Sequence, residues 1–175
     1  MSHDEYLGDD MWSEETVNPT PLYPQIEISQ VSIMEVLALA NLEIRTRDFP
    51  LDEKAIRELV GDMTLFGVTL QVNGVLRGWC IFHAEEKDLY VDRLSVLPHD
   101  DLDLHLEAIF KSITYTPKTS PLMNPKVTVV WPLHERDRPV FQALIAGEWK
   151  ANGLESNRFE GYGQSWDGVK LERQF

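Results

Sequence analysis

Hydrophobic positions along the chain recur with two different periods, and the change of period marks the predicted elements. Strict alternation of apolar and polar residues predicts strands, whereas apolar residues three and four positions apart predict one face of a helix. The pattern predicts strands over 25–30, 65–72, 75–83, 89–97, 126–131, 158–165 and 169–175, and helices over 31–44, 52–61, 100–113 and 137–153.

Turn and capping residues support several of these boundaries. Asn73-Gly74 is a strong signal for a two-residue hairpin, and Trp166-Asp167-Gly168 predicts a second hairpin that closes the sheet. Ser29 or Ser32 can cap the first helix, and Asp52 or a neighbour can begin the second. Gly153 is predicted to end the last helix.

The most informative stretch is the predicted strand 89–97, which ends at Pro98 and runs directly into a helix. Proline cannot donate to a strand ladder, so the strand stops there. We expect Asp100 or Asp101 to accept the first free N–H groups of the helix. The remaining N–H groups of such a turn form a natural anion site.

This stretch resembles the GCN5-related N-acetyltransferases, whose central strand often ends in a Leu-x-Val-x-Pro pattern, here Leu94-Ser95-Val96-Leu97-Pro98. The resemblance implies an α/β (α+β) fold over residues 25–175, with a mixed, mostly antiparallel sheet flanked by about four helices. It also implies acetyl-coenzyme A as cofactor, with the turn and helix holding its pyrophosphate. The cofactor-binding residues would then be Leu94, Val96, Leu97, His99 and Leu102.

The turn departs from that family's pattern at the position that matters for phosphate. The family carries a basic, glycine-rich turn of the form Gln/Arg-x-x-Gly-x-Gly/Ala, whereas residues 99–104 read His-Asp-Asp-Leu-Asp-Leu. Glycine lets the backbone approach a phosphate, while carboxylates repel it and compete for the same N–H donors. We therefore predict that acetyl-coenzyme A binding has been lost and that the chain has no cofactor.

The acid of the family's reaction also lacks a counterpart. In the family, a tyrosine four residues before a terminal Gly-Phe pair protonates the leaving thiolate. Matching that pair to Gly153-Leu154 places Trp149 at the tyrosine position, and an indole N–H is no usable acid. Tyr162 can substitute only if the last hairpin folds over the site.

Asp92 on the central strand is the candidate general base. Its neighbour Arg93 offers an alternative, in which Asp92 is an ordinary salt-bridge partner. His99, His105 and His134 match no zinc spacing and are expected to be solvated, so no metal site is predicted.

Charge and composition exclude several classes of function. The formal net charge of −13 argues against binding to nucleic acid or an anionic membrane. No apolar run approaches the roughly 20 residues of a membrane span. The single cysteine, Cys80, lies in an apolar strand and is expected in the core, which excludes an intrachain disulfide and favours a soluble, cytoplasmic protein.

Residues 1–24 differ from the rest of the chain. They contain six acidic residues, no lysine or arginine, and three prolines near their end, a composition that does not fold alone. Apolar residues interspersed among these acids are predicted to dock on a protein partner: Tyr6, Met11, Trp12, Leu22 and Tyr23. The alternatives are that this segment packs on its own domain or is merely solvated.

Two functions remain open. The first is an acetyltransferase-like domain that has lost its cofactor and serves as a protein-binding or assembly module; by size and fold it is similar to small acetyltransferase-like virion proteins of tailed phages, so a virion location is predicted by analogy. The second is an active N-acetyltransferase that acetylates a cationic amine drawn by the negative surface, with Asp92 or water as base and Tyr162 as acid.

Overall fold

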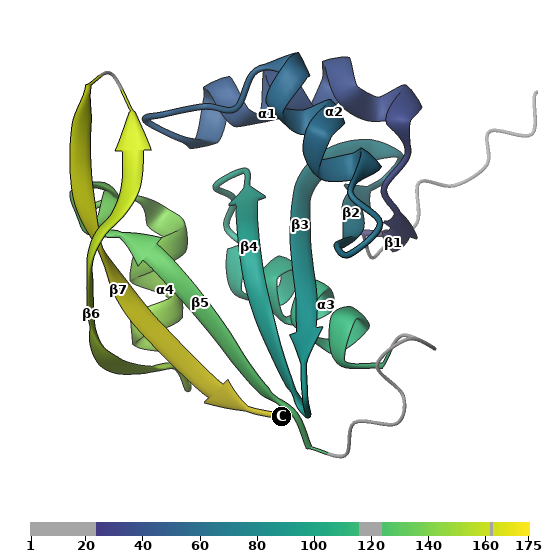
Figure 1. Cartoon of the computed structure of the whole chain (residues 1–175). Helices are drawn as coiled ribbons and strands as arrows, with labels where there is room; N and C mark the ends of the chain where they lie inside the picture. Colours follow the sequence, from purple (N-terminus) through teal and green to yellow (C-terminus); the bar gives the residue numbers. More distant parts are fainter. Residues whose placement is uncertain (1–23, 116–123, 162) are drawn as a thin grey trace, which may run out of the picture.

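A single seven-stranded sheet organises the chain (Figure 1). The computed structural model describes residues 24–115, 124–161 and 163–175. The sheet order is β1-β2-β3-β4-β5-β7-β6, and every neighbouring pair is antiparallel except β4 with β5, which is parallel. The strands are β1 (Ile26–Gln30), β2 (Phe66–Val72), β3 (Val75–Glu85), β4 (Asp88–Val96), β5 (Lys126–Pro132), β6 (Lys150–Gly161) and β7 (Gln164–Gln174).

Helices cover both faces of this sheet (Figure 1). Trp79 and Ile81 of β3 pack under α1 (Val36–Thr46) and α2 (Glu53–Gly61), whereas Cys80 and Phe82 face the core shared with α3 (Leu102–Thr114) and α4 (Pro139–Ala146). Single 3-10 turns, η1 (Ile33–Glu35) and η2 (Leu133–Glu135), precede α1 and follow β5. This mixed, mostly antiparallel sheet with four helices confirms the predicted fold class.

Several local predictions are confirmed at the residues that carried them. Asn73 and Gly74 both have positive φ, 52° and 77°, as a tight hairpin turn requires. Ser32 forms a capping box with Glu35, and Asp52 accepts a hydrogen bond from the N–H of Ala55 at 2.8 Å.

The predicted end of the last helix was wrong. α4 ends at Ala146, and Gly147 caps it by donating its N–H to the carbonyl of Leu144. The chain turns there because Trp149 packs into the core against Phe110 and Phe175. Gly153 instead lies inside β6 with a φ of 92°, at an irregularity of the ladder.

The predicted hairpin at 166–168 was also wrong, because these residues lie inside β7. A Cβ atom on Gly168 would stand 2.5 Å from Val130 Cγ1 and 2.9 Å from Phe159 Cε2. Glycine is therefore needed at this position for close packing between strands and not for a turn. The hairpin joins β6 to β7 between Gly161 and Gln164.

β4 and β5 pair over only three residue pairs, from Leu89 with Val127 to Val91 with Val129. Beyond them the strands diverge, and the α1–α2 connection reaches across toward the β6–β7 hairpin (Figure 1). We call the space between residues 92–96 of β4 and 130–132 of β5 the β4–β5 opening. A bulge at its edge leaves Asp92 without a partner on β3, which changes the direction of this side chain.

In the described part of the chain, no helix has the length and apolarity to cross a membrane. Residues 1–23 lie outside the described residues, so the separate character of segment 1–24 stays a prediction.

Candidate functional site

The β4–β5 opening is occupied by the side chain of Arg47, from the end of α1. Its Nη1 donates to the carbonyl of Leu94 on β4 at 2.8 Å, and its Nε donates to Oε2 of Glu135 at 2.7 Å. The guanidinium carbon lies 4.6 Å from the ring centroid of Trp131 on β5. Arg47 is 5% exposed and Glu135 is 2% exposed. Arg47 therefore bridges the two diverging strands from within.

Little space remains around this guanidinium. The cavity bounded by Arg47, Leu94, Trp131 and Phe159 has a volume of about 10 Å³. A single buried water needs on the order of 10–15 Å³. Protein atoms thus fill the part of the β4–β5 opening around Arg47.

A second buried carboxylate, Glu43, lies one helical turn before Arg47 on α1. Glu43 of α1 is fully buried and accepts hydrogen bonds from Trp79 Nε1 at 2.8 Å and Ser95 Oγ at 2.6 Å. It also pairs with Arg93. Burial alone would raise the pKa of Glu43, but the Arg93 charge and these donors outweigh burial and lower it.

Two ion pairs therefore lie together at the strand ends, the partly buried Arg93 with Glu43 and the buried Arg47 with Glu135. Burial, with a smaller contribution from Arg93, lowers the pKa of Arg47 to about 10, while Glu135 and Glu43 act in the opposite direction. Arg47 stays protonated at neutral pH. Every charge in this network has an opposite partner, which makes it a structural network rather than a proton-transfer site.

Aromatic residues close the outer side of the β4–β5 opening. Phe49 of the α1–α2 connection contacts Trp166 of β7, with 4.2 Å between ring centroids, and the His134 ring contacts both, at 4.8 and 4.5 Å. A Cβ atom on Gly161 would stand 3.3 Å from Phe49, so glycine permits this approach. The α1–α2 connection is thereby fixed to the last hairpin.

The predicted cofactor residues lie in two environments. The side chains of Leu94, Val96, Leu97 and Leu102 are buried in the two cores, and the carbonyl of Leu94 is bonded to Arg47. The side chain of His99 is 44% exposed. The turn itself lies where the sequence predicted it, between β4 and α3.

The expectation that an aspartate caps α3 was wrong. Asp101 occupies the N-cap position, but its side chain accepts no hydrogen bond there. His99 accepts the hydrogen bonds of the first N–H groups instead. Its Nδ1 accepts the N–H of Asp101 at 3.1 Å, and its carbonyl accepts the N–H of Leu102 at 3.0 Å. Two amide donors of the candidate anion site are thus bonded within the turn.

His105 differs from its predicted solvated state. It is 1% exposed, its ring stacks on His99 with 5.5 Å between centroids, and neither ring nitrogen has a hydrogen-bond partner. Burial, and then the neighbouring His99, lowers the pKa of His105. His105 lies on the buried face of α3 together with Leu102, Leu106 and Ile109. The hydrophobic spacing predicted this face from the apolar residues alone, so the burial of His105 was missed.

Asp92 pairs with His83 and not with the neighbouring Arg93. His83 Nδ1 lies 2.6 Å from Asp92 Oδ2, and the His83 ring stacks on Tyr90. Burial would lower the pKa of His83, but the hydrogen bond and charge of Asp92, with help from Glu85, raise it. Both side chains are about a quarter exposed, at 27% and 26%. Sequence reasoning missed His83 because the contact depends on the β3–β4 register.

Other predicted site residues stand as follows. Tyr162 and the partner-docking residues Tyr6, Met11, Trp12, Leu22 and Tyr23 lie outside the described residues. Trp149 lies beyond α4, and counting four residues back from Gly147, the glycine that caps the helix, gives Ala143. α4 contains no tyrosine in either alignment.

Asp48, His134 and Glu135 place potential ligand atoms within 4.8 Å of one another. Glu135 already accepts from Arg47 and from the N–H of Asp48, and Asp48 pairs with Arg138. These carboxylates are neutralised by arginine, so the cluster is no candidate for a cation. Cys80 is fully buried, which confirms its predicted core position, and burial raises the pKa of its thiol.

Comparison with known proteins identifies the fold. No family model matches the sequence, and no curated protein matches it. Solved structures do match. Ribosomal-protein-S18-alanine N-acetyltransferase from Escherichia coli has a TM-score of 0.65 at 13% identity, over 86% of this chain and 94% of that one.

Two further structures agree. A probable acetyltransferase from Staphylococcus epidermidis has a TM-score of 0.64 at 11% identity, over 86% of this chain and 99% of that one. A variant of the spermidine N-acetyltransferase SpeG from Vibrio cholerae has a TM-score of 0.61 at 11% identity, over 86% and 94%. The chain has the fold of the GCN5-related N-acetyltransferases.

Proposed function

We propose that this protein is an acetyltransferase-like domain that no longer binds acetyl-coenzyme A and acts as a protein-binding or assembly module. The observation that carries the proposal is the position of Arg47 between β4 and β5. Diverging strands leave backbone groups unpaired, and an extended ligand can pair with such groups as an added strand does. Here the carbonyl of Leu94 is bonded to Arg47, and a cavity of about 10 Å³ remains.

The turn after β4 supports the same proposal. Two of its amide donors are bonded to His99, and Asp100, Asp101 and Asp103 surround the start of α3. At ~4 Å and a surface-like dielectric, each carboxylate near a phosphate costs on the order of several kcal/mol. That cost is comparable to the whole binding free energy of a micromolar ligand, about 8 kcal/mol.

The partner-binding part of the proposal rests on the sequence. Residues 1–24 carry Tyr6, Met11, Trp12, Leu22 and Tyr23 among six acids, and the net charge of −13 favours a basic protein partner over nucleic acid. A place in a virion is the narrower form of this proposal; it rests on analogy alone and stays a prediction.

Co-purification from the native cell or particle tests the binding role. The test variant replaces the five apolar residues of the N-terminal segment by serine: Tyr6, Met11, Trp12, Leu22 and Tyr23. The control replaces exposed apolar residues elsewhere by serine, Met63, Leu104 and Tyr115, which are 94%, 51% and 81% exposed. We expect the first variant alone to lose the partner. Equal recovery with both variants would contradict docking by this segment.

The second candidate is an active N-acetyltransferase that acts on a cationic amine. The His83–Asp92 pair favours it, because a histidine hydrogen-bonded to a carboxylate at 2.6 Å is a competent proton acceptor. A spermidine N-acetyltransferase is also among the similar structures. Acetyl transfer to spermidine that is lost in Asp92→Asn would establish this function in place of the first.

A further inference from the structure

The outer face of α1 carries no charge over most of its length. Its exposed positions are Leu37, Ala38, Asn41 and Ile44, and the first exposed charge is Arg45. The neighbouring helix α2 exposes Glu53, Lys54, Arg57 and Glu58, as an ordinary solvated surface helix does. A surface helix that lacks charge beside one that is rich in it marks an interaction surface.

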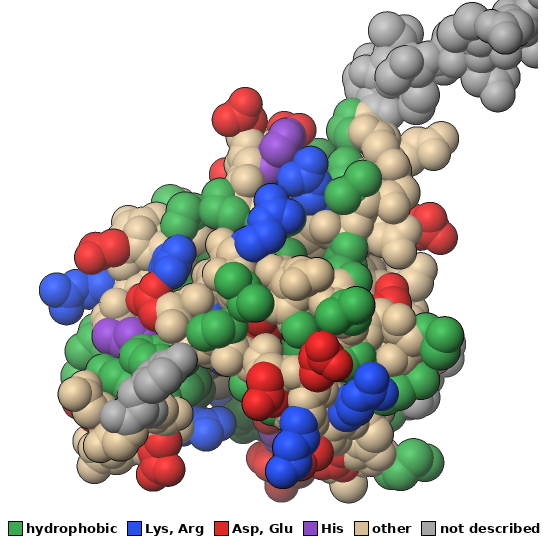
Figure 2. Space-filling model, turned by 90° about the horizontal axis from the view of Figure 1, so that it is seen from above, with side chains coloured by type: hydrophobic (Ala, Val, Ile, Leu, Met, Phe, Trp, Pro, Cys, Tyr) green, Lys and Arg blue, Asp and Glu red, His purple; other side chains and the backbone are tan. Residues whose placement is uncertain are grey.

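Uncharged side chains on this face, with Met34 of the preceding η1 turn, follow helix-pairing spacing. Met34, Leu37, Asn41 and Ile44 are separated by three, four and three residues, and we call these four the α1 seam. Met34 is 88% exposed, Leu37 63% and Ile44 67%. This is the spacing with which one helix presents a stripe to another. Seen from above, hydrophobic side chains lie among charged ones of both signs on this side of the molecule (Figure 2).

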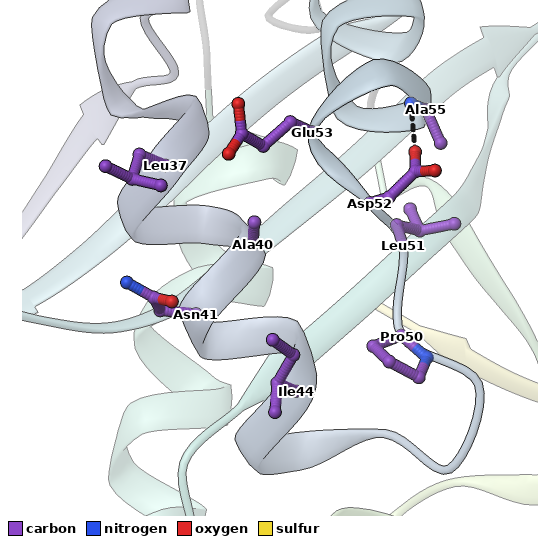
Figure 3. Close-up of a pocket in the computed structure, with 9 residues that line it drawn as sticks. All are labelled: Leu37, Ala40, Asn41, Ile44, Pro50, Leu51, Asp52, Glu53 and Ala55. Atoms are coloured by element: carbon purple, nitrogen blue, oxygen red, sulfur yellow. Dashed lines mark hydrogen bonds between the residues drawn. The ribbon is translucent and has the colours of Figure 1, made fainter.

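A groove of about 600 Å³ runs along the α1 seam. One wall is formed by Leu37, Ala40, Asn41 and Ile44 of α1, and the other by the segment from Pro50 to Ala55 that begins α2 (Figure 3). The groove is open, so it fits a rod that lies along it rather than an enclosed small molecule.

The second wall is acidic. Asp52 and Glu53 line it, Glu53 extends from the start of α2 toward α1 (Figure 3), and the residues that line the groove include no lysine, arginine or histidine. Asp52 caps α2 through the N–H of Ala55, so its position is fixed. A ligand that fits must therefore combine an apolar stripe with positive charge on one side.

We propose that this groove binds a basic amphipathic helix of a protein partner. The inference rests on the proposed protein-binding function and names a surface separate from residues 1–24. A second copy of the chain would bring two molecules of net charge −13, and their acidic groove walls, together. The N-terminal segment is excluded on similar grounds, since it has six acids and no lysine or arginine.

Dimensions define the partner further. Leu37, Asn41 and Ile44 are the seam residues that line the groove, and from Leu37 to Ile44 the helix extends roughly 10 Å, at about 1.5 Å per residue. The bound helix therefore presents about two turns, with apolar residues at i, i+3 or i+4, and i+7 against the seam. Its lysine or arginine residues face Asp52 and Glu53.

The test measures binding of a synthetic peptide of about 18 leucine and lysine residues, patterned as an amphipathic helix, to the full chain by fluorescence anisotropy. A peptide with the same leucines and glutamate in place of lysine is the charge control. We expect saturable binding of the lysine peptide alone. The double variant Leu37→Lys and Ile44→Lys should weaken it at least about tenfold. The control double variant Met63→Lys and Leu104→Lys makes an equal change of charge at exposed residues outside the groove and should weaken it far less.

Charge is tested separately with Asp52→Asn and Glu53→Gln. Asparagine caps helices as well as aspartate does, so α2 is preserved. We expect weaker binding and a smaller loss of affinity as salt is raised. An equal effect of the control double variant and the seam variant would overturn the proposal, as would the absence of binding.

Two other results would assign the groove to a different occupant and so overturn the proposal. One is a dimer in sedimentation that the seam variant dissociates. The other is a gain in peptide affinity when the five N-terminal apolar residues are replaced by serine. Failure of peptide binding would not affect the co-purification test of the N-terminal segment. Binding of acetyl-coenzyme A would overturn the proposed function whatever the peptide does. The two proposals therefore fail separately.

Discussion

Replacing Arg47 by alanine removes the cation that joins β4 to Glu135. The Oε2 atom of Glu135 then lacks its partner while remaining 2% exposed, and the carbonyl of Leu94 loses its donor. Breaking a buried ion pair from one side costs about 3–5 kcal/mol, because the remaining charge is buried without compensation. For a chain of 175 residues this corresponds to a fall in Tm of about 6–20 °C.

Arg138→Ala is the matched control. Arg138 pairs with Asp48 on the same side of the molecule, but both side chains are 38% exposed. An exposed pair contributes about 0–1 kcal/mol. Urea denaturation followed by circular dichroism gives both free energies of unfolding by linear extrapolation.

A double variant tests the reason for the loss. Arg47→Met with Glu135→Leu removes both charges and fills similar volume, so the stability lost through the uncompensated Glu135 charge should return. The carbonyl of Leu94 and the N–H of Asp48 still lack their partners, so the recovery is incomplete. If Arg47→Ala costs no more than Arg138→Ala, the buried bridge is not what holds the β4–β5 opening together, and the reasoning is refuted.

Three further results are expected. Gly168→Ala should cost about 1–3 kcal/mol, because its Cβ meets Val130 at 2.5 Å, whereas Gly61→Ala, with nothing within 4 Å, should be neutral or stabilising in the same urea assay. His105→Leu should raise Tm, and it should do so more at pH 5.5 than at pH 7.5. The pKa of His105 is lowered in the folded state, so the contribution of His105 to stability is full above the unfolded pKa of about 6.5 and is lost as pH falls toward the folded pKa. An equal gain in Tm at both pH values would contradict the buried, neutral state of His105. Asp92→Asn should lower the pKa of His83 in an NMR titration, and an unchanged pKa would show that the pair does not form.

Local chemistry explains which parts of the fold the sequence predicted. Asn73-Gly74, Ser32 with Glu35, and Asp52 act on backbone groups within a few residues, so their roles are visible in a short window. The element order followed from these boundaries and the apolar periods. The hairpin predicted at Gly168 was wrong because Asp-Gly is a turn signal in a sequence. In the structure, glycine is required at this position by the side chains of β5 and β6 that pack against it.

The candidate site was hidden for the opposite reason. Arg47 and Glu135 are 88 residues apart, and no local pattern connects them. Asp92 turns from Arg93 to His83 because of a bulge in the β3–β4 ladder, and strand periodicity does not reveal a bulge. The sequence did predict the unusual turn at 99–104, but it assigned the N–H acceptor to an aspartate instead of His99.

Titration of the full chain with acetyl-coenzyme A in a calorimeter tests the central proposal most directly. With Arg47 between β4 and β5 and three aspartates at the turn, we expect no heat of binding and no rise in Tm at millimolar cofactor. Saturable binding at micromolar cofactor, with a rise in Tm of several degrees, would contradict the proposal and point to an active acetyltransferase.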